Sequence, residues 1–185
     1  MIAVYKLCKT EQSTARQRAL EKGLLELMTQ QRYEDISVSE LCDRISVPRK
    51  SFYRYFSSKD GALFALLDHT MMEFPFSLTD KSTALQDLEQ FFHFWHSQKD
   101  LLDVLERSGL SGILVERATA LALRERMMPQ SLLSLSMDKR TIAMSFAVCG
   151  VMSMVIRWHH QGFRETPGEM TRLAVSLLSK PLLPI

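Results

Sequence analysis

The sequence has few of the features that mark secreted, membrane-inserted or disulfide-stabilised proteins. Its three cysteines, Cys8, Cys42 and Cys149, are far apart and form no C-x-x-C pair, so neither a disulfide framework nor a zinc ribbon is expected. We expect no apolar run near the roughly 18 to 20 residues that span a bilayer, and the N-terminus has no signal-peptide pattern. These absences predict a folded, cytoplasmic protein with reduced thiols and no membrane contact.

The patterns of common enzymes are missing as well. The sequence has no Gly-rich phosphate-binding loop, and no Ser, His and Asp residues can be assigned to a catalytic triad. His93 and His96 are three residues apart and His159 and His160 are adjacent, but no Asp/Glu-x-x-His pattern accompanies them. We therefore expect no enzyme, no cofactor and no metal site; metal sensing is the minor alternative.

Charge is distributed unevenly along the chain. Residues 1–59 hold 11 Lys and Arg against 7 Asp and Glu, whereas the remaining residues hold 12 against 14. Between Arg44 and Lys59, basic residues occur without a single acidic one. Such a local basic surface favours contact with a polyanion, because neutralised phosphates release counterions. A solvated charged face is the alternative interpretation.

Helical periodicity and the absence of strand-like alternation predict an all-α protein of about nine helices. An N-terminal helix is expected from about residue 13 to 32, followed by shorter helices near 38–45, 48–55 and 61–73. Further helices are expected near residues 83–97, 100–108, 110–128, 138–161 and 167–180, separated by breaks that contain glycine or proline. We expect two domains, residues 1–60 and residues 61–185.

The two short helices near residues 38–55 predict a helix-turn-helix motif. Ser37 to Glu40 has the capping-box pattern of a helix start, and Pro48 has the fixed φ that suits a first helical turn. Two short helices joined by about three residues have helix-turn-helix geometry.

The second helix of this motif has the residue types that read a DNA major groove. Phe52 and Phe56, four residues apart, are expected to be buried, while Arg49 and Lys50 are long donors suited to guanine. We expect Tyr53, Tyr55 and Lys59 to bind phosphates. The full set of expected DNA contacts is Ser37, Val38, Ser39, Pro48, Arg49, Lys50, Ser51, Tyr53, Arg54, Tyr55 and Lys59.

The segment from Leu41 through S-V-P-R-K-S-F-Y-R-Y-F to Lys59, Asp60 and Leu63 resembles the DNA-binding domain of the TetR (tetracycline repressor) family. The resemblance implies a dimer of nine-helix subunits. It also implies that Tyr53 and Lys59 hold phosphates, and that ligand binding changes the spacing of the two reading heads. The family commonly has a small residue at position 45, glycine at 46, serine at 48 and glycine at 50. Because serine adopts positive φ less readily than glycine, we expect Ser46 to alter the turn slightly.

The C-terminal helices suggest a small-molecule site and a dimer interface. Methionines and aromatic residues suit adaptable apolar pockets, although a hydrophobic core is the more common role for any one of them. The candidate lining residues for an apolar or aromatic effector are Met71, Phe92, Trp95, Leu114, Met127 and Met152. The helices near residues 138–161 and 167–180 are apolar over a wide face, which favours a homodimer interface; burial within the monomer is the alternative.

Together these features predict a dimeric, ligand-responsive regulator, most simply a repressor, that binds palindromic double-stranded operator DNA. The runner-up is a helical ligand- or metal-binding protein that has lost operator recognition. Steeply salt-dependent DNA binding would favour the first interpretation over the second.

Overall fold

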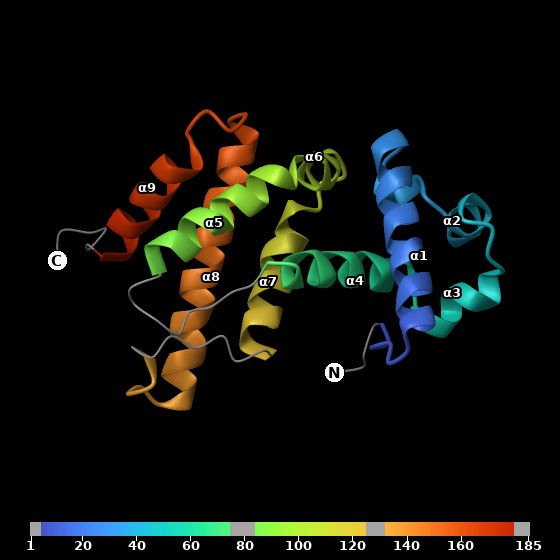
Figure 1. Cartoon of the computed structure of the whole chain (residues 1–185), viewed down its shortest axis with the longest axis horizontal. Helices are drawn as coiled ribbons and strands as arrows, with labels where there is room; N and C mark the ends of the chain where they lie inside the picture. The colour runs from blue at the N-terminus through green and yellow to red at the C-terminus, as the bar shows by residue number, and fades with distance from the viewer. Residues whose placement is uncertain (1–4, 75–83, 125–131, 180–185) are drawn as a thin grey trace. The chain divides into compact units, whose positions relative to one another are not determined.

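The structure, a computed structural model, describes residues 5–74, 84–124 and 132–179. Its fold is all-α, as predicted (Figure 1). Its nine α-helices in the described part of the chain are α1 Glu11–Gln30, α2 Val38–Arg44, α3 Arg49–Tyr55, α4 Lys59–Met72, α5 Ala84–Ser97, α6 Lys99–Arg107, α7 Ser111–Arg124, α8 Met137–His160 and α9 Pro167–Ser179. A short 3-10 helix, η1 Tyr33–Asp35, lies between α1 and α2.

The chain divides into two compact units. The first contains Met1–Met72 and Asp103–Leu110, and the second contains Glu73–Leu102 and Ser111–Ile185. The first unit therefore extends past residue 60, where we placed the boundary, because α4 packs along α1. It also includes the end of α6, where the Arg107 guanidinium donates to the Thr29 carbonyl at 2.8 Å.

The core of the first unit forms around the apolar stripe of α1. Leu20, Leu24, Leu27 and Met28 recur at helical spacing and are buried against α2 and α4. Gly23 lies on the same face, and an added Cβ there would be 2.6 Å from Cγ2 of Ile45. The glycine thus leaves room for the Ile45 side chain.

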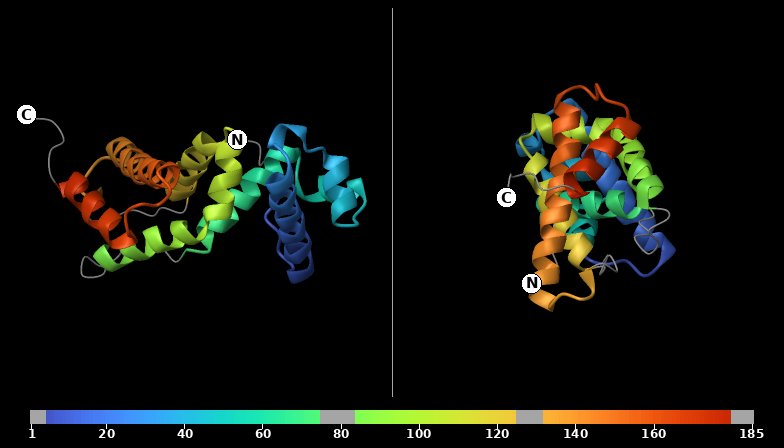
Figure 2. Two further views of the ribbon diagram at one scale, coloured as in Figure 1. Left: turned by 90° about the horizontal axis from the view of Figure 1, so that it is seen from above. Right: turned by 90° about the vertical axis from the view of Figure 1, so that its left-hand side faces the viewer.

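The second unit pairs α7 with α8 and α5 with α9 (Figure 2). Its core is aromatic: Phe92, Trp95 and Trp158 are each at most 1% exposed, and the rings of Phe92 and Trp158 meet edge to face at 5.8 Å. The Trp158 indole donates to the Glu165 carbonyl at 3.0 Å. This hydrogen bond satisfies a buried donor and fixes the loop that leads to α9.

The expectation that no apolar run approaches membrane-spanning length is wrong for α8. Among the described residues, this 24-residue helix is long and apolar enough to cross a bilayer by length and composition alone. One side of α8, including Met144, Met152 and Val155, is buried against α7. Its opposite side is apolar and exposed at Ile142 and Phe146.

Candidate nucleic-acid interface

The turn between α2 and α3 is a Schellman motif, a left-handed helix ending closed by two backbone hydrogen bonds. The Ser46 amide donates to the Asp43 carbonyl at 3.2 Å, and the Val47 amide donates to the Cys42 carbonyl at 2.9 Å. Ser46 itself has φ +54°. The expectation that serine would alter the turn is therefore wrong: Ser46 adopts the left-handed conformation that glycine usually provides.

The two helix starts differ in how they are capped. Ser37 caps α2, because its hydroxyl accepts from the Glu40 amide at 3.1 Å. The carboxylate of Glu40 does not complete the expected capping box; it accepts instead from the Gln31 side chain at 2.6 Å. Pro48 stands at the N-cap of α3 with φ −64°, so it precedes the first helical residue rather than occupying it.

The periodicity of α3 separates an inner from an outer face. Phe52 and Phe56 are buried at 0% and 1% exposure, as predicted, and they anchor the helix in the core of the first unit. Tyr53 is 51% exposed. The cationic residues Arg49, Lys50 and Arg54 are exposed as well.

We call the exposed residues Pro48, Arg49, Lys50, Tyr53 and Arg54 the outer face of α3. Within the described part of the chain, none of its three cations forms a salt bridge. Ser51 lies beside them and is half-buried. The outer face is therefore a compact surface with donors suited to base edges and phosphates.

Two residues that we expected to bind phosphates point into the first unit. Tyr55 is only 5% exposed, and its position three residues after Phe52 places it on the buried side of α3. The Lys59 ammonium donates to the carbonyls of Tyr33 at 2.6 Å and Ile36 at 2.7 Å. The Lys59 ammonium also donates to the Glu34 carbonyl at 3.2 Å.

Lys59 therefore holds the turn between α1 and α2. Its ammonium lies 4.3 Å above the Tyr33 ring, an arrangement that adds cation–π attraction. Burial lowers the pKa of Lys59, while the nearby carboxylates of Asp60, Asp35 and Glu34 oppose the shift. The Tyr33 hydroxyl in turn donates to Asp60 at 2.5 Å. All three ammonium donors are thus engaged within the protein, which the sequence alone did not indicate.

The other expected DNA contacts lie at the start of α2. Ser37 is exposed, and Val38 and Ser39 are half-buried. The first turn of α2 follows the Ser37 cap directly, so these residues accompany the helix N-terminus. A helix N-terminus is a favourable place for a phosphate because its amides carry partial positive charge.

The candidate effector residues of the second unit are core residues. Phe92, Trp95, Leu114 and Met152 are at most 3% exposed. Met71 is also buried but is assigned to the first unit, and Met127 lies outside the described residues. A role for this set in ligand binding stays a prediction.

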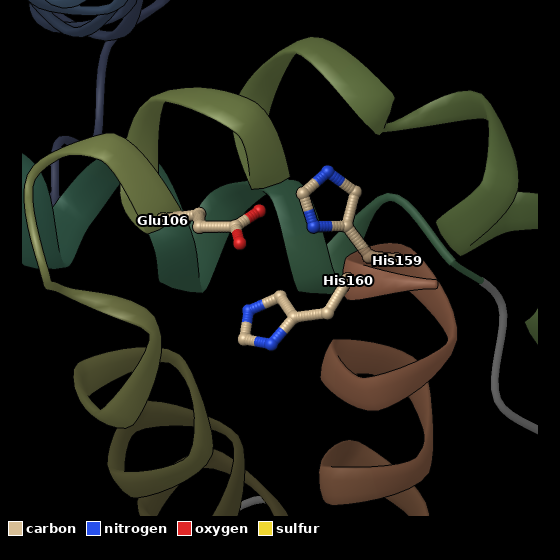
Figure 3. Close-up of side chains that lie close together, drawn as sticks. All are labelled: Glu106, His159 and His160. Carbon is tan, nitrogen blue, oxygen red and sulfur yellow. The ribbon is translucent and has the colours of Figure 1, made fainter. Parts of the chain in front are cut away.

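Two histidines of the second unit, His96 and His159, lie beside aromatic rings. His93 and His96 are exposed on α5, and the His96 ring is 4.8 Å from the Phe163 ring. His159 and His160 are neighbours at the C-terminal end of α8, one buried and one exposed (Figure 3). Their ring centroids are 6.0 Å apart.

A compact helix-turn-helix unit with an exposed basic reading helix defines a DNA-binding protein. Residues 22–66 match the family model described as "Bacterial regulatory proteins, tetR family". The N-terminal part of the chain is therefore similar to the DNA-binding domain of tetR-family regulatory proteins.

Solved structures share the fold over most of the chain. The "Dihydroxyacetone kinase operon activator DhaS" is similar at a TM-score of 0.56 and 15% identity, covering 88% of this chain and 93% of that one. A tetR-family transcriptional regulator from Streptomyces coelicolor is similar at a TM-score of 0.56 and 19% identity, covering 89% and 81%. No curated protein sequence gave a significant match.

Proposed function

We propose that this protein is a cytoplasmic, ligand-responsive repressor that binds a palindromic operator as a homodimer. The observation that carries the proposal is the outer face of α3, whose cations are exposed and form no salt bridge within the described part of the chain. In this mode α3 enters the major groove from its N-terminal end.

We assign a role to each residue of the interface from the exposure and the length of its side chain. Arg49 and Lys50, at the N-terminal end of α3, contact base edges together with Ser51. Tyr53 and Arg54 bind the phosphate backbone, and the start of α2 at Ser37, Val38 and Ser39 binds a neighbouring phosphate. Pro48 lies at the edge of the groove. In this proposal Tyr55 and Lys59 are scaffold residues.

The exposed faces of α8 and α9 support the homodimer. Phe146 is 68% exposed and Ile142 is 69% exposed on α8, and Leu173 is 48% exposed on α9. Large exposed apolar side chains on two helices are typical of a surface that a partner covers. A second copy of the chain is the occupant that we propose, in a two-fold arrangement of four helices.

Gly150 gives independent support for this interface. It lies in the middle of α8, where glycine costs roughly 1 kcal/mol relative to alanine, and an added Cβ there would meet nothing within 4 Å. The protomer alone therefore gives no packing reason for the glycine. Close approach of a partner helix over the small residues Ala147, Gly150 and Ser153 supplies one.

The effector is proposed to be apolar or aromatic and to bind in the second unit, near the core residues Phe92, Trp95, Leu114 and Met152. Binding of the effector would change the spacing of the two α3 helices in the dimer and release the operator. One similar solved structure is named as an operon activator, and an activator has the opposite effect on transcription to a repressor. Repression is therefore tested separately, by placing the selected operator in front of a reporter gene.

The DNA-binding proposal is tested by selecting sequences from a randomised duplex library with the full-length protein, followed by gel-shift titration. Selection should return a two-fold symmetric consensus. Arg49→Ala should weaken binding by roughly 1 to 3 kcal/mol and relax preference at one position in each half-site. The matched control is Arg164→Ala, at an exposed position of the second unit, which should bind like the wild type. If the two variants bind alike, the outer face of α3 does not read DNA.

A further inference from the structure

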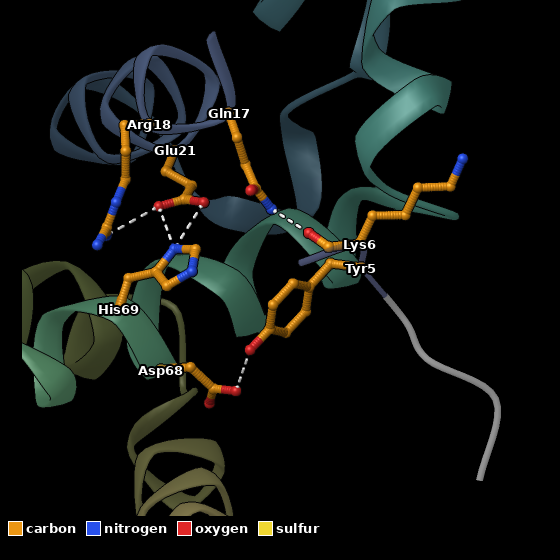
Figure 4. Close-up of polar contacts among 7 residues, drawn as sticks. All are labelled: Tyr5, Lys6, Gln17, Arg18, Glu21, Asp68 and His69. Atoms are coloured by element: carbon orange, nitrogen blue, oxygen red, sulfur yellow. Dashed lines mark hydrogen bonds and ion pairs between the residues drawn. The ribbon is translucent and has the colours of Figure 1, made fainter. Parts of the chain in front are cut away.

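The segment Tyr5–Thr10, just before α1, is tied firmly to the first unit. Tyr5 is 9% exposed, and its hydroxyl donates to the Asp68 carboxylate at 2.5 Å (Figure 4). Its ring packs edge-on against His69 with centroids 5.8 Å apart. These two contacts fix the position of Tyr5 against α4.

The backbone of Tyr5 and Lys6 is fixed to the C-terminal end of α3. Tyr5 forms an isolated antiparallel bridge with Phe56, and the Lys6 amide donates to the carbonyl of Tyr55, the last residue of α3, at 2.9 Å. The Lys6 carbonyl accepts from the Gln17 side chain at 3.1 Å. Both backbone polar groups of Lys6 are thereby satisfied, and the segment holds a fixed position beside the C-terminal end of α3.

Polar side chains of α1 make two further sets of contacts beside the segment. Gln17 is 1% exposed, so its amide is committed to Lys6 rather than to solvent. His69 Nδ1 lies 2.9 Å from the buried carboxylate of Glu21, which also meets the Arg18 guanidinium at 3.3 Å. The contact between Glu21 and His69 joins α1 to α4 beside Tyr5, as Figure 4 shows.

The side chains that this anchoring presents are basic. Lys6 and Lys9 are exposed, and Leu7 is 72% exposed. The segment contains no acidic residue, and neither lysine forms a salt bridge with any residue that the structure describes. Ordering a chain segment costs conformational entropy. A segment ordered through buried polar bonds, yet presenting two unpaired cations, is suited to an anionic partner.

We propose that Tyr5–Thr10 forms a rigid basic arm, in which Lys6 and Lys9 bind DNA phosphates at the edge of the groove that α3 enters. This inference rests on the proposed DNA-binding function. The backbone contact to Tyr55 places the arm at the C-terminal end of α3, while the N-terminal end of the helix carries Arg49 and Lys50. Bases are read at one end of α3 and the DNA backbone is held at the other. Phosphate contacts carry no sequence information, so the arm contributes affinity without preference.

The test compares Lys6→Ala/Lys9→Ala with a charge-matched control, Lys22→Ala/Arg164→Ala, in the full-length protein. Lys22 and Arg164 are exposed, and Lys22 lies about 17 Å along α1 from its start at Glu11, at a rise of about 1.5 Å per residue. Binding is measured by fluorescence anisotropy with a labelled 30-base-pair duplex obtained by library selection, and with the same duplex after scrambling. Each titration is repeated across a series of salt concentrations.

The arm variant should lower the slope of log K against log salt by about 0.9 for each phosphate contact removed. It should weaken binding to both duplexes by the same factor, of roughly tenfold or more at physiological salt. The control should behave like the wild type. Thermal unfolding of both variants within about 2 °C of the wild type establishes that the fold is intact.

The possible failures are distinguishable. If the arm variant and the control have equal slopes while Arg49→Ala loses sequence preference, the arm proposal is overturned and the DNA-binding function stands. If the arm variant loses affinity only for the selected duplex, the arm proposal is also overturned, because that result indicates that the lysines contact bases. If the wild type binds neither duplex, the proposed function and the arm fail together.

Discussion

Replacing Ser46 with glycine is expected to stabilise the helix-turn-helix. Ser46 occupies the left-handed position of a Schellman motif with φ +54°, and its side chain is exposed. In the described part of the chain the side chain of Ser46 makes no hydrogen bond that the substitution would remove. The change therefore acts on the backbone alone, and both closing hydrogen bonds can persist.

The magnitude follows from two opposing effects. An L-residue in the left-handed region costs roughly 1–2 kcal/mol, which glycine relieves. Glycine also makes the unfolded chain more flexible, which offsets roughly 0.4–1 kcal/mol of the gain. The free energy of unfolding should rise by about 0.5–1 kcal/mol, equivalent to about 1–4 °C in a protein of this size.

Gly109 provides the reciprocal substitution within the same unit. It ends α6 in the same motif, since the Leu110 amide donates to the Leu105 carbonyl at 2.8 Å. Its φ is +67°, and an added Cβ there would meet nothing within 4 Å. Gly109→Ser should therefore destabilise the protein by about the amount that Ser46→Gly stabilises it.

Urea denaturation, followed by circular dichroism, measures both changes. The midpoints should move in opposite directions while the dependence on urea concentration stays constant, because the surface exposed on unfolding is unchanged. If Ser46→Gly lowers the midpoint, the left-handed serine is not strained, and its side chain stabilises the turn by some other contact.

Three further predictions concern Lys59, Phe146 and Gly23. Lys59→Met should lower the free energy of unfolding by about 2–4 kcal/mol, because it removes the ammonium that donates to the carbonyls of Tyr33, Glu34 and Ile36. It should leave the salt dependence of DNA binding unchanged; a lower slope with unchanged stability would make Lys59 a phosphate ligand instead. Phe146→Glu should convert the dimer to a folded monomer in light scattering, whereas Met72→Glu, at another exposed apolar residue, should stay dimeric; two dimeric variants would refute the α8 interface. Gly23→Ala should destabilise by roughly 1–2 kcal/mol through the clash with Ile45, and Ile45→Ala should rescue it; additive losses in the double variant would contradict that contact.

The helices were predictable because their periodicity and breaks are local features. Pro167 begins α9 and Gly162 follows α8 within one or two residues of the expected positions, since proline and glycine act on the backbone around them. The left-handed turn at Ser46 was harder to predict. The hydrogen bonds that close the Schellman motif set the φ of Ser46. The intrinsic preference of serine gives only the average free-energy cost of a serine in the left-handed region.

The site was predictable in its outline but not in the direction of each side chain. Helical spacing from Phe52 is enough to place Tyr55 inside, so that error was avoidable. The partners of Lys59 are carbonyls more than twenty residues away, and no local pattern indicates them. The arm was missed for the same reason, because its position depends on contacts from Tyr5 to Phe56 and Asp68.

The salt dependence of wild-type binding tests the central claim most directly. The full-length protein is titrated with its selected duplex and with the scrambled duplex from low to high salt. The claim predicts a steep linear fall of log K with log salt for both duplexes, and selected binding tighter by roughly 10³-fold or more at physiological salt. Equal affinity for the two duplexes, or affinity that does not change with salt, would contradict a sequence-reading helix-turn-helix.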